Sequence, residues 1–153
     1  MIRAAIIALT LCASLPATAQ TYVVRHLHTP AGERDPDLLP EGKAAAEALA
    51  KWFKGKRLRA IYVSDFRRTR QTAALLADAR RLTPIVYDPA DTPALIARVR
   101  ATKGPVLIVG HSNTVPDVIE ALGGTRPAPL SHPNFGDIWT VTKGRTTRVM
   151  FAR

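Results

Sequence analysis

Four basic side chains in this sequence follow short apolar stretches that are typical of buried strands. The stretches are residues 22–24, 60–63 and 105–109, and the side chains that follow them are Arg25, His26, Arg68 and His111. A guanidinium group offers paired donors that match the geometry of a phosphate, and a neutral imidazole is a competent nucleophile near neutral pH. Two arginines and two histidines in one pocket would form a site for a phosphate-sized anion.

The chemistry that these residue types favour is transfer of a phosphoryl group to His26. In this scheme Arg25 and Arg68 bind the phosphoryl oxygens, and His111 binds the same oxygens and stabilises the transition state. We also expect the backbone amides at the helix start after Asp65 to help bind the anion. We expect no metal and no cofactor, because the fixed cations take the place of a metal ion.

The three apolar stretches must lie side by side for these residues to meet. Continuous apolar runs separated by helical patterns are typical of parallel strands covered on both faces, and ligands bind at the carboxyl ends of such strands. The sequence therefore predicts an α/β fold, a three-layer α/β/α sandwich with a mostly parallel central sheet. We expect helices over about 40–54, 67–79, 93–101 and 115–122, and further strands over about 84–87, 138–142 and 147–151. Ser64 or Asp65 is expected to cap the second helix.

The first 20 residues have the pattern of a signal peptide. Arg3 precedes an apolar stretch over residues 4–15, and Ala17-Thr18-Ala19 supplies the small residues of a cleavage site. We therefore divide the chain into a signal peptide, residues 1–20, and one domain, residues 21–153, and expect a periplasmic or secreted protein. A lipid anchor on Cys12 is the alternative, although Leu11 stands where such signals have a small residue.

The formal net charge of +10 makes the chain strongly basic. Such a charge attracts nucleic acid and anionic lipid nonspecifically, but aromatic residues make up only 6% of the chain and so give little support to a surface that stacks nucleic-acid bases. We interpret the basic residues as a solvated face. The expected partner is a phosphorylated small molecule or another phosphomonoester, with no specific nucleic acid and no membrane association after leader cleavage.

Two other classes of function are compatible with the same residues. His26, His28 and His111 would give a three-histidine metal site, although Arg25 and Arg68 would repel a dication. A non-catalytic phosphate-binding or anion-binding protein of the same fold would keep the pocket without turnover. His132 lies in a proline-rich loop and has no expected role.

The motifs resemble those of the histidine phosphatases, which are also called phosphoglycerate-mutase-like. Arg25-His26 resembles the family's nucleophile motif, and residues 64–73 (SDFRRTRQTA) resemble its second motif, in which Arg68 matches the phosphate ligand. Residues 110–114 (GHSNT) are similar to the block that carries the second pocket histidine, and residues 35–42 to the loop before the first helix. The resemblance implies a small single-domain bacterial member, a phosphohistidine intermediate on His26, and a metal-independent phosphomonoesterase.

The sequence also departs from the family pattern. Leu27 stands where glycine usually follows the nucleophile, and Leu39 where Thr or Ser is common. Larger members of the family carry a glutamate as general acid in an inserted region. This short chain has no obvious equivalent of that glutamate. Asp88, Asp91 and Asp117 are the candidate proton donors. Without a positioned acid, aryl phosphates and phosphoramidates should react best, because their leaving groups are good.

Overall fold

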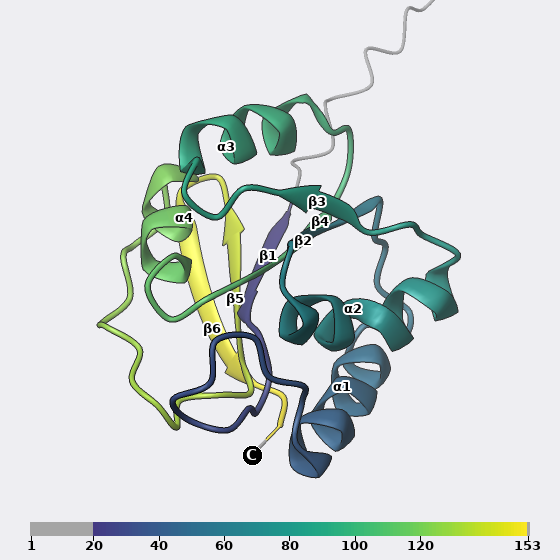
Figure 1. Ribbon diagram of the computed structural model, residues 1–153. Helices are drawn as coiled ribbons and strands as arrows, with labels where there is room; N and C mark the ends of the chain where they lie inside the picture. Colours follow the sequence, from purple (N-terminus) through teal and green to yellow (C-terminus); the bar gives the residue numbers. More distant parts are fainter. Residues whose placement is uncertain (1–19, 153) are drawn as a thin grey trace, which may run out of the picture.

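The computed structural model describes residues 20–152, which form the expected three-layer α/β/α sandwich (Figure 1). The predicted signal peptide lies outside the described residues, apart from Gln20. The elements in chain order are β1 (Thr21–Arg25), α1 (Pro40–Trp52), β2 (Ala60–Ser64), α2 (Arg67–Arg80), β3 (Ile85–Tyr87), α3 (Thr92–Ala101), β4 (Val106–Gly110), α4 (Val115–Ala121), β5 (Asp137–Thr142) and β6 (Arg145–Met150). No helix within residues 20–152 has the length and apolarity to cross a membrane.

The six strands form one sheet in the order β3-β2-β4-β1-β5-β6. The first four strands of that order are parallel, while β5 runs antiparallel to β1, and β6 antiparallel to β5. Arg25, the last residue of β1, pairs with Gly110, the last residue of β4. The amide of His26 extends this pairing by donating to the Gly110 carbonyl oxygen at 2.9 Å, so His26 and His111 leave the sheet side by side.

The strands are apolar throughout because helices cover both faces of the sheet (Figure 1). Tyr22 and Val24 belong to a buried cluster with residues of α1 and α2. Val23, which points to the opposite face, belongs to a second cluster with residues of α3 and α4. The side chains of β1 therefore pack into two cores, one on each face of the sheet, and both cores fix the position of its carboxyl end.

Helix α1 approaches the loop after β1 very closely at Gly42. A Cβ atom at this position would lie 2.5 Å from the carbonyl oxygen of His28, which is nearer than real Cβ contacts come. The loop is tied there because the Leu39 amide donates to the same carbonyl oxygen at 2.9 Å. Leu39 provides no side-chain cap, as its residue type implies. The close approach fixes the loop that follows His26.

The expected cap of α2 is wrong. Neither Ser64 nor Asp65 accepts a bond from the first helical amides, and the N-cap residue is Phe66, which makes no side-chain cap bond. The amide of Arg67 donates to a carboxylate oxygen of Asp35, in the β1–α1 loop, at 2.9 Å. A distant carboxylate therefore caps this helix and occupies one of the amides that we expected to bind the anion.

Candidate active site

The four basic residues singled out from the sequence lie together at the carboxyl ends of β1, β2 and β4. The ring centroids of His26 and His111 are 5.5 Å apart. One hollow is lined by His26, Arg68 and His111, and an adjoining hollow by Arg25, His26 and Arg68. Three segments distant in sequence thus supply one cluster, as the strand-end argument predicts.

His26 is held as a neutral imidazole with one free nitrogen. Its Nδ1 lies 2.9 Å from the carbonyl oxygen of Leu27, and only a protonated nitrogen can donate to a carbonyl. Burial, together with the charges of Arg25 and Arg68, lowers the pKa of His26 to about 3, although the Leu27 hydrogen bond opposes the shift. The Nε2 atom therefore carries a lone pair at neutral pH.

Leu27 fits this position because its side chain belongs to the core. The side chain is fully buried and packs with Leu38, Ala45 and Ala46, away from the histidine cluster. Its amide donates to the Thr72 hydroxyl at 3.0 Å, and its carbonyl oxygen accepts from His26. The backbone groups that orient the imidazole are thus present without a glycine.

His111 uses both of its ring nitrogens inside the protein. Nε2 lies 2.8 Å from the hydroxyl oxygen of Ser64, and Nδ1 lies 3.2 Å from the Nη2 atom of Arg68. Because a guanidinium only donates, Nδ1 accepts and Nε2 carries the proton. Burial, followed by the charges of Arg68 and Arg25, lowers the pKa of His111 to about 4. His111 is therefore neutral in this arrangement.

Arg68 is positioned from the β1–α1 loop. Its Nη1 atom donates to the Arg34 carbonyl oxygen at 3.1 Å and to a carboxylate oxygen of Asp35 at 3.4 Å. The guanidinium also lies over the ring of Phe66, 4.3 Å from its centroid. Burial lowers the pKa of Arg68, while Asp35 opposes the shift. Asp35 thus holds both this arginine and the start of α2.

Arg25 anchors the chain segment before β5. Its Nη1 atom donates to the carbonyl oxygens of Ser131 and Asn134 at 2.8 and 3.1 Å, and its guanidinium lies 4.2 Å from the centroid of the Phe135 ring. The Nε atom is buried and makes no hydrogen bond to residues 20–152. Burial and the charge of Arg68 lower the pKa of Arg25 to about 10, so it is a cation at neutral pH with donors to spare.

His132 has a structural place that sequence reasoning missed. Its Nε2 atom lies 3.1 Å from the Thr29 carbonyl oxygen, and its ring meets Phe135 edge to face. Together with Arg25 and His26 it lines one of the two hollows. Only the tertiary fold brings this proline-rich loop back over the end of β1, so local sequence gave no signal of it.

The three candidate proton donors are engaged elsewhere. The carboxylates of Asp88 and Asp91 accept from the amides of Ala90 and Ala94, and Asp117 pairs with Arg126 at 2.6 Å. None of the three lines either hollow beside His26. An exposed carboxylate that we did not single out, Glu33, lines the hollow that contains Arg25 and His26.

The three-histidine metal set is not formed. The ring of His28 packs against Phe135, with centroids 4.6 Å apart, and lines a separate hollow with Asp137 and Arg148. Within residues 20–152, no three side chains of His, Cys, Asp or Glu are arranged to hold a metal ion. This alternative fails because His28 lies in the loop beyond β1, where its ring turns away from His26 and His111.

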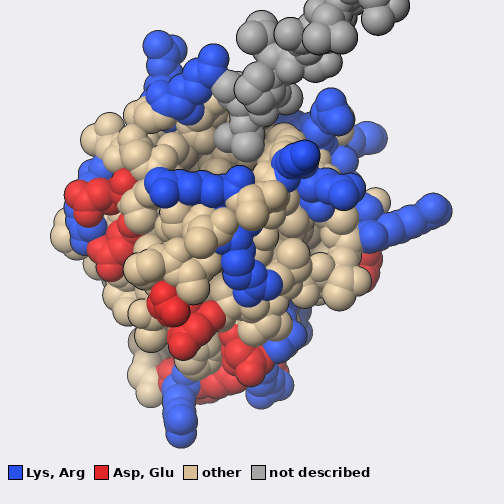
Figure 2. Space-filling model, turned by 90° about the horizontal axis from the view of Figure 1, so that it is seen from above, with Lys and Arg blue, Asp and Glu red and all other residues tan. Residues whose placement is uncertain are grey.

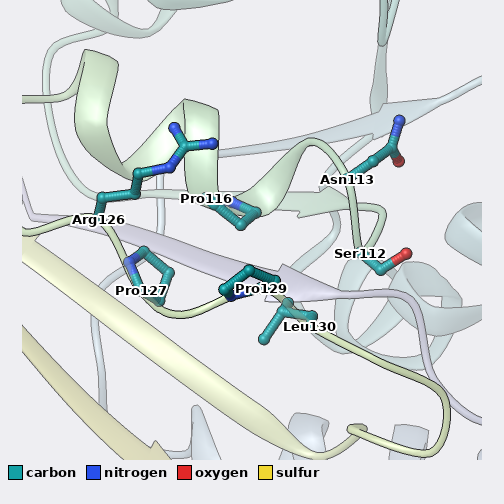
Figure 3. A pocket seen from close by; sticks show the side chains of 7 residues that line it. All are labelled: Ser112, Asn113, Pro116, Arg126, Pro127, Pro129 and Leu130. Atoms are coloured by element: carbon teal, nitrogen blue, oxygen red, sulfur yellow. The ribbon is translucent and has the colours of Figure 1, made fainter.

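A further hollow adjoins the histidine cluster on the side of α4 (Figure 3). Ser112 and Asn113 line both this hollow and the one that contains His26. Its remaining lining is mostly apolar and comprises Pro116, Arg126, Pro127, Pro129 and Leu130. Arg126 is neutralised here by Asp117 and Glu120. A group bound at the cluster therefore has an apolar shelf beside it.

Comparison with known proteins agrees with this geometry. Residues 21–90 match the histidine phosphatase superfamily (branch 1). The fold is similar to that of the protein histidine phosphatase SixA complexed with tungstate, with a TM-score of 0.68 and 22% identity over 85% of this chain and 94% of that one. It is also similar to a putative phosphohistidine phosphatase SixA from Agrobacterium tumefaciens, with a TM-score of 0.64 and 20% identity over 88% and 98% of the two chains.

A mycobacterial glucosyl-3-phosphoglycerate phosphatase has the same fold, with a TM-score of 0.67 and 14% identity over 88% of this chain and 98% of that one. A search of curated proteins by sequence found no match. The matched residues 21–90 include His26 and Arg68, which the structure places in one cluster with His111. Residues 21–90 therefore match the histidine phosphatase superfamily, and the fold of residues 20–152 is similar to that of phosphatases of known structure.

Proposed function

We propose that this protein is an exported, metal-independent phosphomonoesterase that works through a phosphohistidine on His26. The observation that carries the proposal is the hydrogen bond from Nδ1 of His26 to the Leu27 carbonyl oxygen at 2.9 Å. This bond leaves Nε2 unprotonated, in a cluster that also contains Arg25 and Arg68. The leader pattern of residues 1–20 supports export to the periplasm or the medium.

The reaction takes place in two displacements at phosphorus. In the first, Nε2 of His26 attacks, the bond from phosphorus to the leaving group breaks, and the leaving atom takes up a proton. In the second, water attacks, the P–N bond to His26 breaks, one water proton is released, and phosphate departs. Arg25, Arg68 and His111 stabilise the negative charge on the phosphoryl oxygens in both steps.

Aryl phosphates and phosphoramidates are the substrates that we expect to react fastest. Asp88, Asp91 and Asp117 are all bound elsewhere, and Glu33 is exposed, so none of these four carboxylates is held in place to protonate a poor leaving group. The apolar shelf beside Ser112 and Asn113 would support an aromatic leaving group. One structural neighbour is a protein histidine phosphatase, whose substrate class contains a phosphoramidate bond.

The test is hydrolysis of para-nitrophenyl phosphate by the purified protein, with and without a chelator. We expect turnover that resists the chelator and is inhibited by vanadate, and an acid-labile phosphoenzyme in rapid-quench samples. His26→Ala should lose turnover by at least about 10³-fold while still binding phosphate, because the nucleophile is gone and the arginines remain. His28→Ala, which alters the neighbouring histidine outside the cluster, is the matched control.

Three results would contradict parts of the proposal. Turnover that a chelator abolishes would point to a metal site. Tight phosphate binding without turnover of any phosphoester or phosphoramidate would indicate a non-catalytic anion-binding protein. A rate that does not depend on the pKa of the leaving group, across a series of aryl and alkyl phosphates, would show that a proton donor is present after all.

A further inference from the structure

Exposed or partly exposed basic side chains gather at the end of the sheet opposite the histidine cluster. Six of them define what we call the basic end: Lys54, Lys56, Arg57, Arg59, Arg81 and Lys103. They follow the carboxyl ends of α1, α2 and α3, and they precede β2, β3 and β4. Figure 2 views this end, where Lys and Arg are prominent and most of the visible Asp and Glu lie towards the left and lower parts.

The basic end is one continuous surface. The guanidinium of Arg80, beside Arg81, donates to the carbonyl oxygen of Phe53, beside Lys54. The amide of Arg59 donates to the Pro105 carbonyl oxygen at 2.6 Å, which brings Arg59 next to the segment that carries Lys103. Three stretches of the chain are therefore joined side by side, and their charges act together.

These charges are not neutralised within the described chain. All six ion pairs found among residues 20–152 involve Arg67, Arg68, Arg70, Arg126 or Arg148, and none involves a residue of the basic end. Around the start of α2, near the histidine cluster, Asp35, Asp37 and Asp65 balance the arginines. Much of the positive charge of the protein is thus left uncompensated at one end.

The chain also enters the domain at the basic end. The carbonyl oxygen of Gln20, the first described residue, accepts from the amide of Val106 at the start of β4. The 19 residues before Gln20, with the apolar stretch 4–15, are therefore attached at this end of the sheet. If the leader is removed near Ala19, a new α-amino group adds positive charge to the same place.

We propose that the basic end binds the surface of a bilayer that contains anionic phospholipids, which leaves the histidine cluster facing away from the membrane. Clustered Lys and Arg residues are attracted to anionic lipid head groups, and each charge near the surface strengthens the binding. This differs from our expectation of no membrane association. The sequence gives the total charge, whereas the fold concentrates that charge where the leader joins the domain.

A nucleic acid is the less suitable polyanion for this surface. Of the two aromatic residues just before Lys54, Phe53 is fully buried, and Trp52 is half-buried with the ammonium group of Lys56 over its ring, 4.0 Å from the centroid. Neither ring is therefore free to stack on a base. The proposal depends on charge placement alone and does not rest on the phosphatase mechanism.

The experiment is co-sedimentation of the full chain with vesicles of phosphatidylcholine, with and without phosphatidylglycerol. The test variant is Arg57→Gln/Arg59→Gln/Lys103→Gln. Its matched control, Lys43→Gln/Arg67→Gln/Arg70→Gln, removes three charges from the opposite ends of α1 and α2. All three proteins carry the same leader, so differences between them report the basic end, and thermal melts check that each variant is folded.

We expect binding that requires phosphatidylglycerol and weakens as salt rises. The test variant should bind about 100-fold more weakly than the parent protein, and the control should bind within about threefold of it. Equal losses in the two variants would overturn the proposal, because net charge alone would then explain binding. Equal binding to neutral vesicles, or tighter binding to a duplex DNA oligonucleotide at the same ionic strength, would also overturn it.

Discussion

The Nδ1 atom of His111 lies 3.2 Å from Nη2 of Arg68, and its Nε2 atom lies 2.8 Å from the Ser64 hydroxyl oxygen. A neutral His111 held in this way has no N–H left to offer a bound anion. To become a donor, it must exchange the Arg68 contact for an anion oxygen and take up a proton. Anion binding at this site is therefore coupled to protonation of His111.

This coupling predicts that sulfate binds more weakly as pH rises. The pKa of His111 is lowered to about 4 by burial and by Arg68 and Arg25, and a bound dianion raises it. Between the pKa of His111 in the free protein and its higher pKa in the sulfate complex, sulfate binding takes up a proton. The affinity for sulfate should therefore fall by up to about tenfold per pH unit as pH increases. Isothermal titration with sulfate, which does not titrate in this range, measures the slope. His111→Gln should flatten it, and a slope unchanged in that variant would exclude His111 as the coupled group.

Ser64→Ala is expected to disturb catalysis more than stability. The Ser64 hydroxyl is fully buried and holds Nε2 of His111, so its loss frees the ring to rotate. We expect kcat to fall about tenfold and the free energy of unfolding by about 1 kcal/mol. The control is Thr69→Val, which breaks bonds to Ser64 and Phe66 without removing the partner of His111. A normal kcat in Ser64→Ala would show that this bond does not position the ring.

Arg25→Lys tests the double role of Arg25. A lysine keeps the positive charge but lacks the several N–H donors of a planar guanidinium. The guanidinium of Arg25 can donate to the Ser131 and Asn134 carbonyl oxygens and still have donors left for phosphate. We expect kcat/KM to fall about 100-fold, and limited proteolysis between residues 126 and 134 to become faster. Arg148→Lys, which alters the pair with Asp137, is the control. Unchanged proteolysis would mean that Arg25 does not hold this loop.

Leu27→Gly would introduce the residue that is usual in the family, and we expect it to harm the protein. The buried Leu27 side chain packs with Leu38, Ala45 and Ala46, so its removal should cost at least about 3 kcal/mol of unfolding free energy. Turnover should not rise, because the Leu27 carbonyl that orients His26 is already in place. Urea unfolding and kcat measured on the same samples test both points. A more active Leu27→Gly variant would contradict them.

The sheet was predictable because its strands are continuous apolar runs. The helix covering residues 67–80 and the strand covering 106–110 fall within a residue or two of their expected positions. Strand ends in a parallel sheet point to one edge, so the meeting of His26 with His111 followed from topology. These features depend on local pattern, which is visible in the sequence.

Contacts made by loops were not predictable in the same way. Asp35 caps α2, and His132 contacts Thr29, because the tertiary fold brings loops together that are distant in sequence. The residue types favour Ser64 or Asp65 as the cap of α2, but the Ser64 hydroxyl binds His111 instead. In each case several partners were compatible with the residue type, and packing decided between them.

The place of β1 in the sheet has a consequence for local opening of the native state. β1 is paired on both sides, with β4 and β5. The two edge strands are β3, which is only three residues long, and β6, which is largely exposed. Edge strands fray at a lower free energy than interior ones, so their amides should exchange with deuterium first. β1, which leads directly into the proposed nucleophile His26, is thereby protected from fluctuations at either edge of the sheet.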